Sequence, residues 1–388
     1  MTLSLAEVTC LLDGWYDPRW AEPWDAVGLV CGDPEQPVRR VLLAVDPSPA
    51  VVAEAHSWGA DLVVCHHPLL LTPVHGVAAT TPKGRVVHDL GRAGTALFTA
   101  HTNADVPLDG VNEALARAVG VLDATVLGSD RGSTRDPAAE PMDKLVVFVP
   151  VEHAEAVREA LACAGAGIVG DYADCSFTSL GEGRFRPQAG ADPAVGRVGA
   201  ATLVTEARIE MVAPRRLRRE VLAAMRAAHP YEEVAHDVLE LAASPGPALV
   251  RGHGRIGRLA TPTTLRGFAD QVAWALPETA TGVRVAGDPD RPVHTVAVGS
   301  GSGDGLLDLV LTTDADVYLT SDLRHHRAGE FREHDGAALV DVAHWAAEWT
   351  WLPVVEQKLR AAAVERGDTV ETRVSTIVTD PWTFRVGR

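Results

Sequence analysis

The sequence contains no long hydrophobic run, although 46% of its 388 residues are hydrophobic. No stretch of 18 or more apolar residues is present, which argues against a transmembrane helix. The N-terminal segment MTLSLAEVTCLLDGW has no basic region and includes Glu7, so we expect no signal peptide. The sequence therefore predicts a cytoplasmic protein with no membrane partner.

Lysine and paired cysteines are also scarce. Lysine occurs only at Lys83, Lys144 and Lys358, and no GxxxxGK[ST] motif is present, which excludes a P-loop nucleotide hydrolase. The five cysteines form no CxxC pair, so a reduced chain is the simplest interpretation. The 52 acidic residues outnumber the 35 basic ones, and the resulting net charge of −17 disfavours binding to nucleic acid.

Strands and helices are expected to alternate along residues 1–127. Short apolar runs typical of buried strands are separated by stretches typical of helices. We expect strands at 38–46, 61–65 and 95–100, and helices at 49–60, 84–93 and 111–119. This alternation predicts an α/β fold in which helices cover a parallel sheet.

The middle of the chain has a different character. Residues 128–142 are rich in Gly, Pro and charge, and we interpret them as a linker. Residues 143–242 follow a β-α-β-β-α-β pattern, which predicts a small inserted α+β domain with a ferredoxin-like fold. A second linker is expected at 243–251.

Alternating units resume after the insert. We expect strands at 293–298, 316–320 and 338–341, and helices near 304–313, 324–335 and 344–350. The simplest architecture is one α/β domain with a parallel-rich sheet, formed by residues 1–127 and 252–388 and split by the insert.

Ionisable residues follow three of the expected strands. They are His66 and His67 after DLVVC, His101 and Asp105 in HTNAD after TALFTA, and His344 and Glu348 in HWAAE after ALVDVA. Ligands of open α/β sheets bind at the carboxyl ends of the strands. Three strand ends in one sheet can converge on a single cleft, so we expect these side chains to lie together.

Imidazoles and carboxylates in this number suggest a metal centre. His344 and Glu348 are spaced i,i+4 and would share one face of a helix, whereas Pro107 favours a turn for His101 and Asp105. The set is too large for one tetrahedral ion but suits two ions about 3.5–4 Å apart. The mixed ligands suit Zn, Fe, Mn or Ni equally. A single strand-end histidine would more often be a core or surface residue, and only the three clusters together favour the metal.

Two further features leave alternatives open. His326, in TSDLRHH, also follows an expected strand and is a candidate for facing the substrate or supporting a metal ligand. The glycine loop VGSGSGDG at 298–305 lacks a strict GxGxxG, so a tight turn is favoured over a phosphate cradle.

At these clusters the chain resembles the hexameric, dinuclear-metal proteins named GTP cyclohydrolase 1 type 2 homologues. The matching segments are EPWDAVGLVCGD (22–33), ADLVVCHHPLL (60–70), HTNADVPLDGVNEALA (101–116), VGSGSGD (298–304), ADVYLTSDLRHH (315–326) and DVAHWAAEW (341–349). The insert is similar to the PII/CutA-like domain of longer family members, through GDYADCSFTSLGEGRFRP (170–187) and HPYEEVAHDV (229–238).

The resemblance implies a set of site residues and an assembly. It implies that two divalent cations are held by His66, His67, Asp105, His344 and Glu348, with Glu348 as a bridge. His101 would be a further ligand or the partner of one. A homohexamer, with the chain itself as partner, is also implied.

Two hypotheses about function follow. The first is a metal-dependent hydrolase for a small-molecule substrate, in which two ions activate water and His101 or His326 transfers protons. The nucleotide-like or phosphoester character of that substrate comes from the resemblance alone. The second is a non-catalytic scaffold or sensor, in which the ions stabilise a ring and the insert binds an effector or partner.

Overall fold

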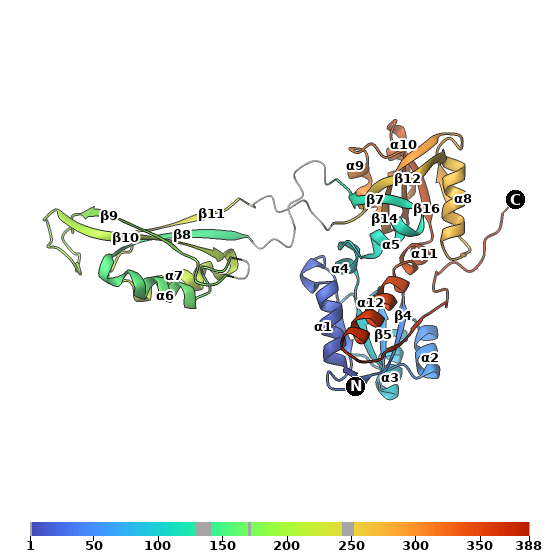
Figure 1. Cartoon of the computed structure of the whole chain (residues 1–388), viewed down its shortest axis with the longest axis horizontal. Helices are drawn as coiled ribbons and strands as arrows, with labels where there is room; N and C mark the ends of the chain where they lie inside the picture. Colours follow the sequence, from blue (N-terminus) through green and yellow to red (C-terminus); the bar gives the residue numbers. More distant parts are fainter. Residues whose placement is uncertain (1, 129–140, 170–171, 243–251, 388) are drawn as a thin grey trace. The chain divides into compact units, whose positions relative to one another are not determined.

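We describe a computed structural model of the chain, which covers residues 2–128, 141–169, 172–242 and 252–387 (Figure 1). It divides into two compact units, one formed by residues 1–134 and 246–388 and the other by residues 135–245. The expected linker at 243–251 and most of the one at 128–142 lie outside the described residues. Within the described ranges, no helix has the length and apolar character needed to cross a membrane.

The first sheet of the larger unit has the strand order β17-β4-β5-β6-β2. Its strands are β2 (Gly28–Cys31), β4 (Arg40–Ala44), β5 (Leu62–Cys65), β6 (Ala96–Thr99) and β17 (Glu371–Val374). Four of them pair in parallel, and β2 pairs antiparallel with β6. The apolar runs of the central strands therefore form a largely parallel sheet, as the sequence predicts.

Helices cover both faces of this sheet. Successive side chains of a strand point to opposite faces, so Val41 and Leu43 pack with α1 (Leu5–Trp15) and α12 (Leu352–Glu365), whereas Leu42 packs with α2 (Pro49–Trp58) and α3 (Pro82–Ala93). Burial on both faces explains why these strands are continuously apolar.

The second sheet of the larger unit has the order β13-β16-β15-β14-β12-β7. Its strands are β7 (Val121–Val126), β12 (Arg255–Thr264), β13 (Arg284–Ala286), β14 (Pro292–Ser302), β15 (Val317–Ser321) and β16 (Ala338–Val342). Strands β14, β15 and β16 are parallel, and the other three pair antiparallel. The helices around it include α5 (Val111–Ala118), α8 (Leu265–Ala275), α10 (His325–Glu333) and α11 (His344–Trp349).

The expectation of one parallel-rich sheet is therefore wrong, because the two halves of the chain contribute to two sheets. In a single sheet, strands of the two halves such as β6 and β14 would pair with each other. Here β6 pairs with β5 and β2, and β14 pairs with β15 and β12, so neither strand has a free edge for the other sheet. One continuous hydrophobic core nevertheless joins them, since Val64 and Phe98 of the first sheet belong to the same buried cluster as Leu319 and Val340 of the second.

Two local predictions also need correction. The helix expected near 304–313 is a 3-10 turn, Gly303–Leu306, followed by the single turn α9 (Leu307–Val310). The turn expected after His101 is the four-residue helix α4 (Thr102–Asp105).

The smaller unit has strands and helices in the order β-α-β-β-α-β. Its elements are β8 (Met142–Pro150), α6 (Ala154–Cys163), β9 (Phe177–Phe185), β10 (Thr202–Pro214), α7 (Arg218–Ala228) and β11 (His236–Glu240). The antiparallel sheet has the order β11-β8-β10-β9, and both helices pack in its core against side chains of β8 and β10. This unit has a hydrophobic core of its own.

Candidate metal centre

The two sheets bring together the side chains that follow their strands. His66 and His67 come directly after β5, and their backbone N–H groups still bond to Ala44 and Val45 at the end of β4. His101 follows β6 by two residues, and His344 begins α11 two residues after β16. Because the strand-end residues of both sheets meet, the site lies between the sheets.

Glu348 lies at the centre of this cluster. Its Oε1 is 2.8 Å from His344 Nε2 and 3.3 Å from His66 Nε2, and its Oε2 is 3.0 Å from His67 Nε2. The contact with His344 is the expected i,i+4 pair on α11, and only 3% of the Glu348 side chain is exposed. One buried carboxylate therefore contacts three imidazoles from two sheets.

His101 and Asp105 complete the cluster on the side of His66. The ring centroids of His66 and His101 are 5.1 Å apart, and Asp105 Oδ1 is 3.9 Å from His66 Nε2. The Ser300 hydroxyl donates to Asp105 Oδ1 at 3.4 Å. The structure thus places all six residues proposed as ligands at one site.

Two groups of three residues have ligand atoms close enough to hold an ion. One consists of His66, His67 and His101, and the other of His67, His344 and Glu348; within each, the ligand atoms lie within 4.8 Å of one another. His67 belongs to both groups. The described residues could therefore hold metal by imidazole and carboxylate ligands.

Each of the four imidazoles also has a hydrogen-bond partner at its Nδ1 atom, on the side of the ring away from the cluster. His66 Nδ1 donates to the Ala100 carbonyl at 2.9 Å, which fixes the tautomer because a carbonyl can only accept. The other three Nδ1 atoms lie at hydrogen-bond distance from carboxylates: His67 from Asp46 at 2.7 Å, His101 from Asp25 at 2.8 Å and His344 from Asp322 at 2.7 Å. All four Nε2 atoms are thereby left for the centre of the cluster, as in protein metal sites.

The three outer carboxylates were not identified from the sequence as site residues. Asp46 and Asp322 follow β4 and β15 closely, so a strand-end position was the available signal. Asp322 has a φ of 56°, an uncommon conformation for a residue other than glycine, and its side chain contacts His344. Asp25 lies in the segment EPWD, which resembles the family sequence, but the resemblance assigns no role to this residue.

Burial and charge in the cluster favour a cation. Burial disfavours charged rings, yet Glu348 and the outer carboxylates raise the pKa of His67 to about 10 and that of His344 to about 11. Burial also opposes charge on Glu348, but the surrounding imidazoles hold its pKa well below the usual range. Burial and the charge of Glu348 raise the pKa of Asp105 well above the usual range. Positive charge at the centre would allow both carboxylates to ionise.

Unpaired buried atoms provide a direct test of whether a metal fits. Among the described residues, His66 Nε2 and Glu348 Oε2 are buried and form no well-aligned hydrogen bond, although His66 Nε2 lies 3.3 Å from Glu348 Oε1 and Glu348 Oε2 lies 3.0 Å from His67 Nε2. Buried polar atoms are rarely left unpaired, so each needs a partner of another kind. A lone pair on nitrogen and a carboxylate oxygen are both ligands for Zn, Fe, Mn or Ni, so these residues fit a divalent cation.

The backbone of the glycine loop at 298–305 passes close to the ligand side chains of this cluster. Gly301 has a φ of 68°, and a Cβ atom added to it would lie 3.0 Å from Glu348 Oε1 and 3.4 Å from His344 Nε2. The loop therefore brings backbone close to the ligands at a position where a side chain would intrude.

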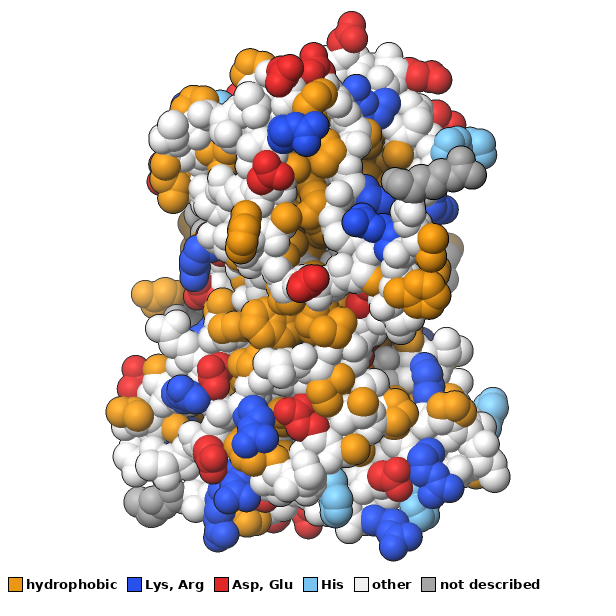
Figure 2. Space-filling model, turned by 90° about the vertical axis from the view of Figure 1, so that its right-hand side faces the viewer, with side chains coloured by type: hydrophobic (Ala, Val, Ile, Leu, Met, Phe, Trp, Pro, Cys, Tyr) orange, Lys and Arg blue, Asp and Glu red, His pale blue; other side chains and the backbone are white. Residues whose placement is uncertain are grey.

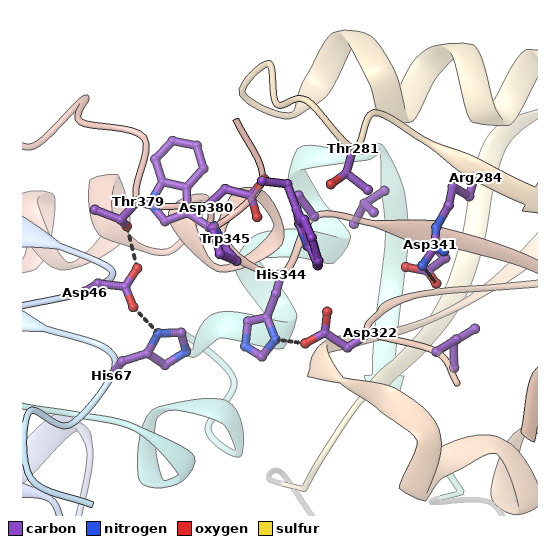
Figure 3. Close-up of a pocket in the computed structure, with 15 residues that line it drawn as sticks. Asp46, His67, Thr281, Arg284, Asp322, Asp341, His344, Trp345, Thr379 and Asp380 are labelled. Carbon is purple, nitrogen blue, oxygen red and sulfur yellow. Dashed lines mark hydrogen bonds and ion pairs between the residues drawn. The ribbon is translucent and has the colours of Figure 1, made fainter. Parts of the chain in front are cut away.

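A cavity of about 620 Å³ adjoins the cluster (Figure 3). The rings of His67 and His344 lie side by side in its wall, with Asp46 and Asp322 on their outer sides. Arg284 and Asp341, whose side chains are 2.6 Å apart, also line it. The C-terminal segment contributes Thr379, Asp380, Pro381 and Trp382. The face of the molecule on the right-hand side of Figure 1 carries a band of hydrophobic side chains across its middle (Figure 2).

His326 is placed differently from the other candidates. It lies in the exposed first turn of α10, with its ring 5.2 Å from that of His325, and is absent from the described residues that line the cavity. Its expected role beside the substrate therefore has no geometric support.

Comparison with known proteins identifies the family of the chain. Residues 3–381 match the family described as Duf34/NIF3 (NGG1p interacting factor 3). The chain belongs to this family. A Mycobacterium tuberculosis member named GTP cyclohydrolase 1 type 2 homolog is 51% identical over 382 residues, covering 98% of this chain and 97% of its own. A Bacillus subtilis member of the same name is 35% identical over 382 residues, covering 97% and 98%. The resemblance drawn from the sequence motifs is confirmed.

Solved structures share the fold. A Bacillus cereus protein related to NIF3 is 37% identical, with a TM-score of 0.66 and coverage of 99% of this chain and 100% of its own. A Staphylococcus aureus protein is 26% identical, with a TM-score of 0.72 and coverage of 99% of both chains. The mixed α/β fold with several sheets is therefore shared along essentially the whole chain.

Proposed function

We propose that this chain binds two divalent cations and is a metal-dependent hydrolase for a nucleotide-like or phosphoester substrate. The observation that carries the proposal is the convergence of three imidazole Nε2 atoms, those of His66, His67 and His344, on the buried carboxylate of Glu348, with His101 beside His66. The residues assigned to the ions are His66, His67, Asp105, His344 and Glu348, and His101 is a further ligand or the partner of one.

The two overlapping ligand groups support a pair of ions rather than one. His66 and His101, with Asp105 beside them, lie on one side of the cluster, and His344 lies on the other. Glu348 contacts rings of both groups through its two oxygens, which suits a bridging carboxylate. Two divalent ions in such a site lower the pKa of water and polarise the bond to be hydrolysed.

His101 is the residue best placed to move a proton. Although burial opposes its charge, hydrogen bonds from His101 and Thr102 lower the pKa of Asp25 to about 2, so Asp25 stays a carboxylate. That carboxylate holds the proton of His101 at Nδ1. The Nε2 atom then faces the cluster, where it can accept or return a proton if it is not ligating.

Two observations support the substrate class: the volume of the cavity and the names of the related proteins. A cavity of about 620 Å³ falls within the range of small-molecule sites, about 300–1,000 Å³, and is large enough for a nucleotide. The relatives carry the name GTP cyclohydrolase 1 type 2 homolog, which suggests nucleotide-like molecules as the first substrates to test. A homohexamer and a PII/CutA-like role for the smaller unit are further parts of the proposal.

The first experiment is elemental analysis of the natively expressed protein, followed by a screen of nucleotides and phosphoesters with the metal found. We expect close to two ions per chain and turnover of at least one compound. Glu348→Gln should remove most of the bound metal and the turnover, whereas Glu330→Gln, on the exposed side of α10, should change neither.

The results also separate the hydrolase from the scaffold hypothesis. If Glu348→Gln destroys the assembly and lowers thermal stability while the parent protein has no activity, the ions have a structural role. Fewer than about one ion per chain at full occupancy would refute the dinuclear centre itself.

A further inference from the structure

The C-terminal segment after β17 forms one wall of the cavity. The N–H of Ser375 donates to the Leu43 carbonyl at 2.8 Å, and its hydroxyl donates to Glu54 at 2.6 Å. Four residues later, the Thr379 hydroxyl donates to Asp46, the carboxylate that holds His67. The segment is therefore fixed at two points before it reaches the cavity.

Asp380 in this wall has an unpaired oxygen. The residue is only 8% exposed, yet it lines the same cavity as Trp345 (Figure 3). The backbone N–H of Trp382 donates to its carboxylate, but Oδ2 is buried and has no hydrogen-bond partner among the described residues. A buried acceptor without a partner destabilises the structure, and a ligand that donates a hydrogen bond to it would remove that cost.

Asp341 repeats this feature on another part of the wall. It is 7% exposed, and its carboxylate accepts hydrogen bonds from Arg284 at 2.6 Å and from the backbone N–H of Leu323. Its Oδ1 atom is buried without a partner in the part of the chain that the structure describes. Outside the metal cluster, the cavity wall thus carries two unpaired acceptors.

Trp382 adds an aromatic surface beside Asp380. Its side chain lines the cavity and is 67% exposed, although indole groups are usually largely buried. Trp345 also lines the cavity but is only 5% exposed. A flat ligand therefore has one accessible indole face, next to a carboxylate that needs a donor.

We propose that Asp380 and Trp382 form a subsite for a planar nitrogen heterocycle whose edge donates hydrogen bonds. The ring stacks on Trp382, and its N–H groups donate to the Asp380 carboxylate. This inference rests on the proposed function, since the metal cluster would hold the reacting end of the same substrate, and it deepens that function by assigning the other end.

The wall fits a heterocycle better than a simple organic cation. Quaternary ammonium groups are usually bound by cages of several aromatic faces, and only one accessible indole lines this cavity among the described residues. A heterocycle without N–H donors would stack but leave the Asp380 oxygen unpaired. A ring such as guanine, which carries adjacent N–H groups, satisfies both requirements.

The test is calorimetric titration of the metal-loaded protein with GMP, AMP and phosphocholine. All three carry a phosphate for the metal end and differ in the group offered to the subsite. We expect GMP to bind at least about ten-fold more tightly than AMP and phosphocholine. Trp382→Ala should weaken GMP about ten-fold or more, whereas Trp382→Phe should retain most of the affinity.

Asp380→Asn separates the hydrogen bond from the stacking. It should weaken GMP by about ten-fold and AMP much less, with the metal content of the protein unchanged. Trp274→Ala is the matched control, because Trp274 on α8 is 91% exposed and does not line the cavity. The Trp274→Ala variant should bind all three probes with the affinity of the parent protein.

The outcomes distinguish this inference from the proposed function. Equal binding of the three probes, tighter phosphocholine binding, or GMP binding that neither variant weakens would overturn the subsite while leaving the hydrolase proposal intact. Failure of every probe to bind a protein with full metal content would also overturn it. A protein that holds no metal would instead refute the proposed function.

Discussion

Arg255 offers the sharpest test of how the chain directly after Asp105 is held in place. Its side chain is fully buried at the start of β12, and its Nε donates to Glu113 at 3.1 Å. The guanidinium also donates to four backbone carbonyls, those of Val106, Pro107, Gly252 and Gly254, at 2.6–3.1 Å. Since two of these carbonyls directly follow Asp105, one arginine fixes the chain next to a proposed ligand.

Arg255→Met should destabilise the larger unit by about 3–5 kcal/mol. Methionine fills much of the volume but leaves the carbonyls without a donor and Glu113 without its cation, and breaking a buried ion pair typically costs this much. Glu113 is 19% exposed, so partial hydration places the expected value toward the lower end. Metal affinity should fall as well, because the residues that follow Asp105 lose the hydrogen bonds that fix their position.

The assay can report on the larger unit alone. All nine tryptophans (15, 20, 24, 58, 274, 345, 349, 351 and 382) lie outside residues 135–245, so tryptophan fluorescence during urea unfolding does not follow the smaller unit. Arg92→Met on the exposed side of α3 is the matched control and should change the free energy of unfolding by less than about 0.5 kcal/mol. Glu113→Gln, alone and combined with Arg255→Met, isolates the ion pair.

A loss of less than about 1 kcal/mol for Arg255→Met would refute this reasoning. So would a loss equal to that of Arg92→Met. Normal metal affinity in a clearly destabilised variant would show that Arg255 supports the fold without positioning Asp105.

Three further predictions concern other parts of the chain. Asp46→Asn should weaken metal binding about 10–100-fold in a chelator competition, because the carboxylate that orients a ligand histidine is lost. Gly301→Ala should also reduce metal content, since its φ is positive and its Cβ would crowd Glu348. In the smaller unit, Asp143→Asn should lower thermal stability at neutral pH, because hydrogen bonds from Arg218 and a second arginine lower the pKa of Asp143. A carboxylate with a lowered pKa stabilises the folded state above its unfolded pKa, so this difference should disappear as the pH falls below about 4.

Each of these three has a control or a contrary result. Unchanged chelator competition for Asp46→Asn would mean that Asp46 does not orient His67. Gly91→Ala, at a position in α3 where a Cβ meets nothing within 4 Å, should leave metal content unchanged. A constant difference between parent and Asp143→Asn from pH 7 to pH 3 would show that the charge of Asp143 does not contribute.

Local features of the sequence were sufficient to predict most of the individual elements. The run LVVC forms β5, and α2 begins with Pro49 after the Ser48 cap and ends at Trp58, before the capping residue Gly59, which has a φ of 72°. Buried strands, helix caps and terminating glycines are specified by neighbouring residues, so they are visible in the sequence. The ligand residues were visible for a similar reason, since few structural roles require histidines and carboxylates after three strands.

Pairing partners and supporting residues were less predictable. The four residues of β17 pair with β4, more than 300 positions earlier, and nothing in ETRV specifies that partner. Asp46 and Asp322 are common residue types at strand ends, where they usually form turns. Asp380 and Trp382 lie in an irregular segment with no periodic pattern, so only the folded chain reveals that they line a cavity.

Because the chain forms two sheets, the residues of the metal cluster come from both of them. His66, His67 and His101 follow strands of the first sheet, whereas Glu348 and His344 follow a strand of the second. A cation held by these side chains would therefore connect the sheets, and with them the parts of the chain that precede and follow the insert. Binding to the folded state alone stabilises that state, so metal affinity and the packing of the sheets are linked. A substitution that loosens either sheet should lower metal affinity even when it lies, like Arg255, outside the set of ligands.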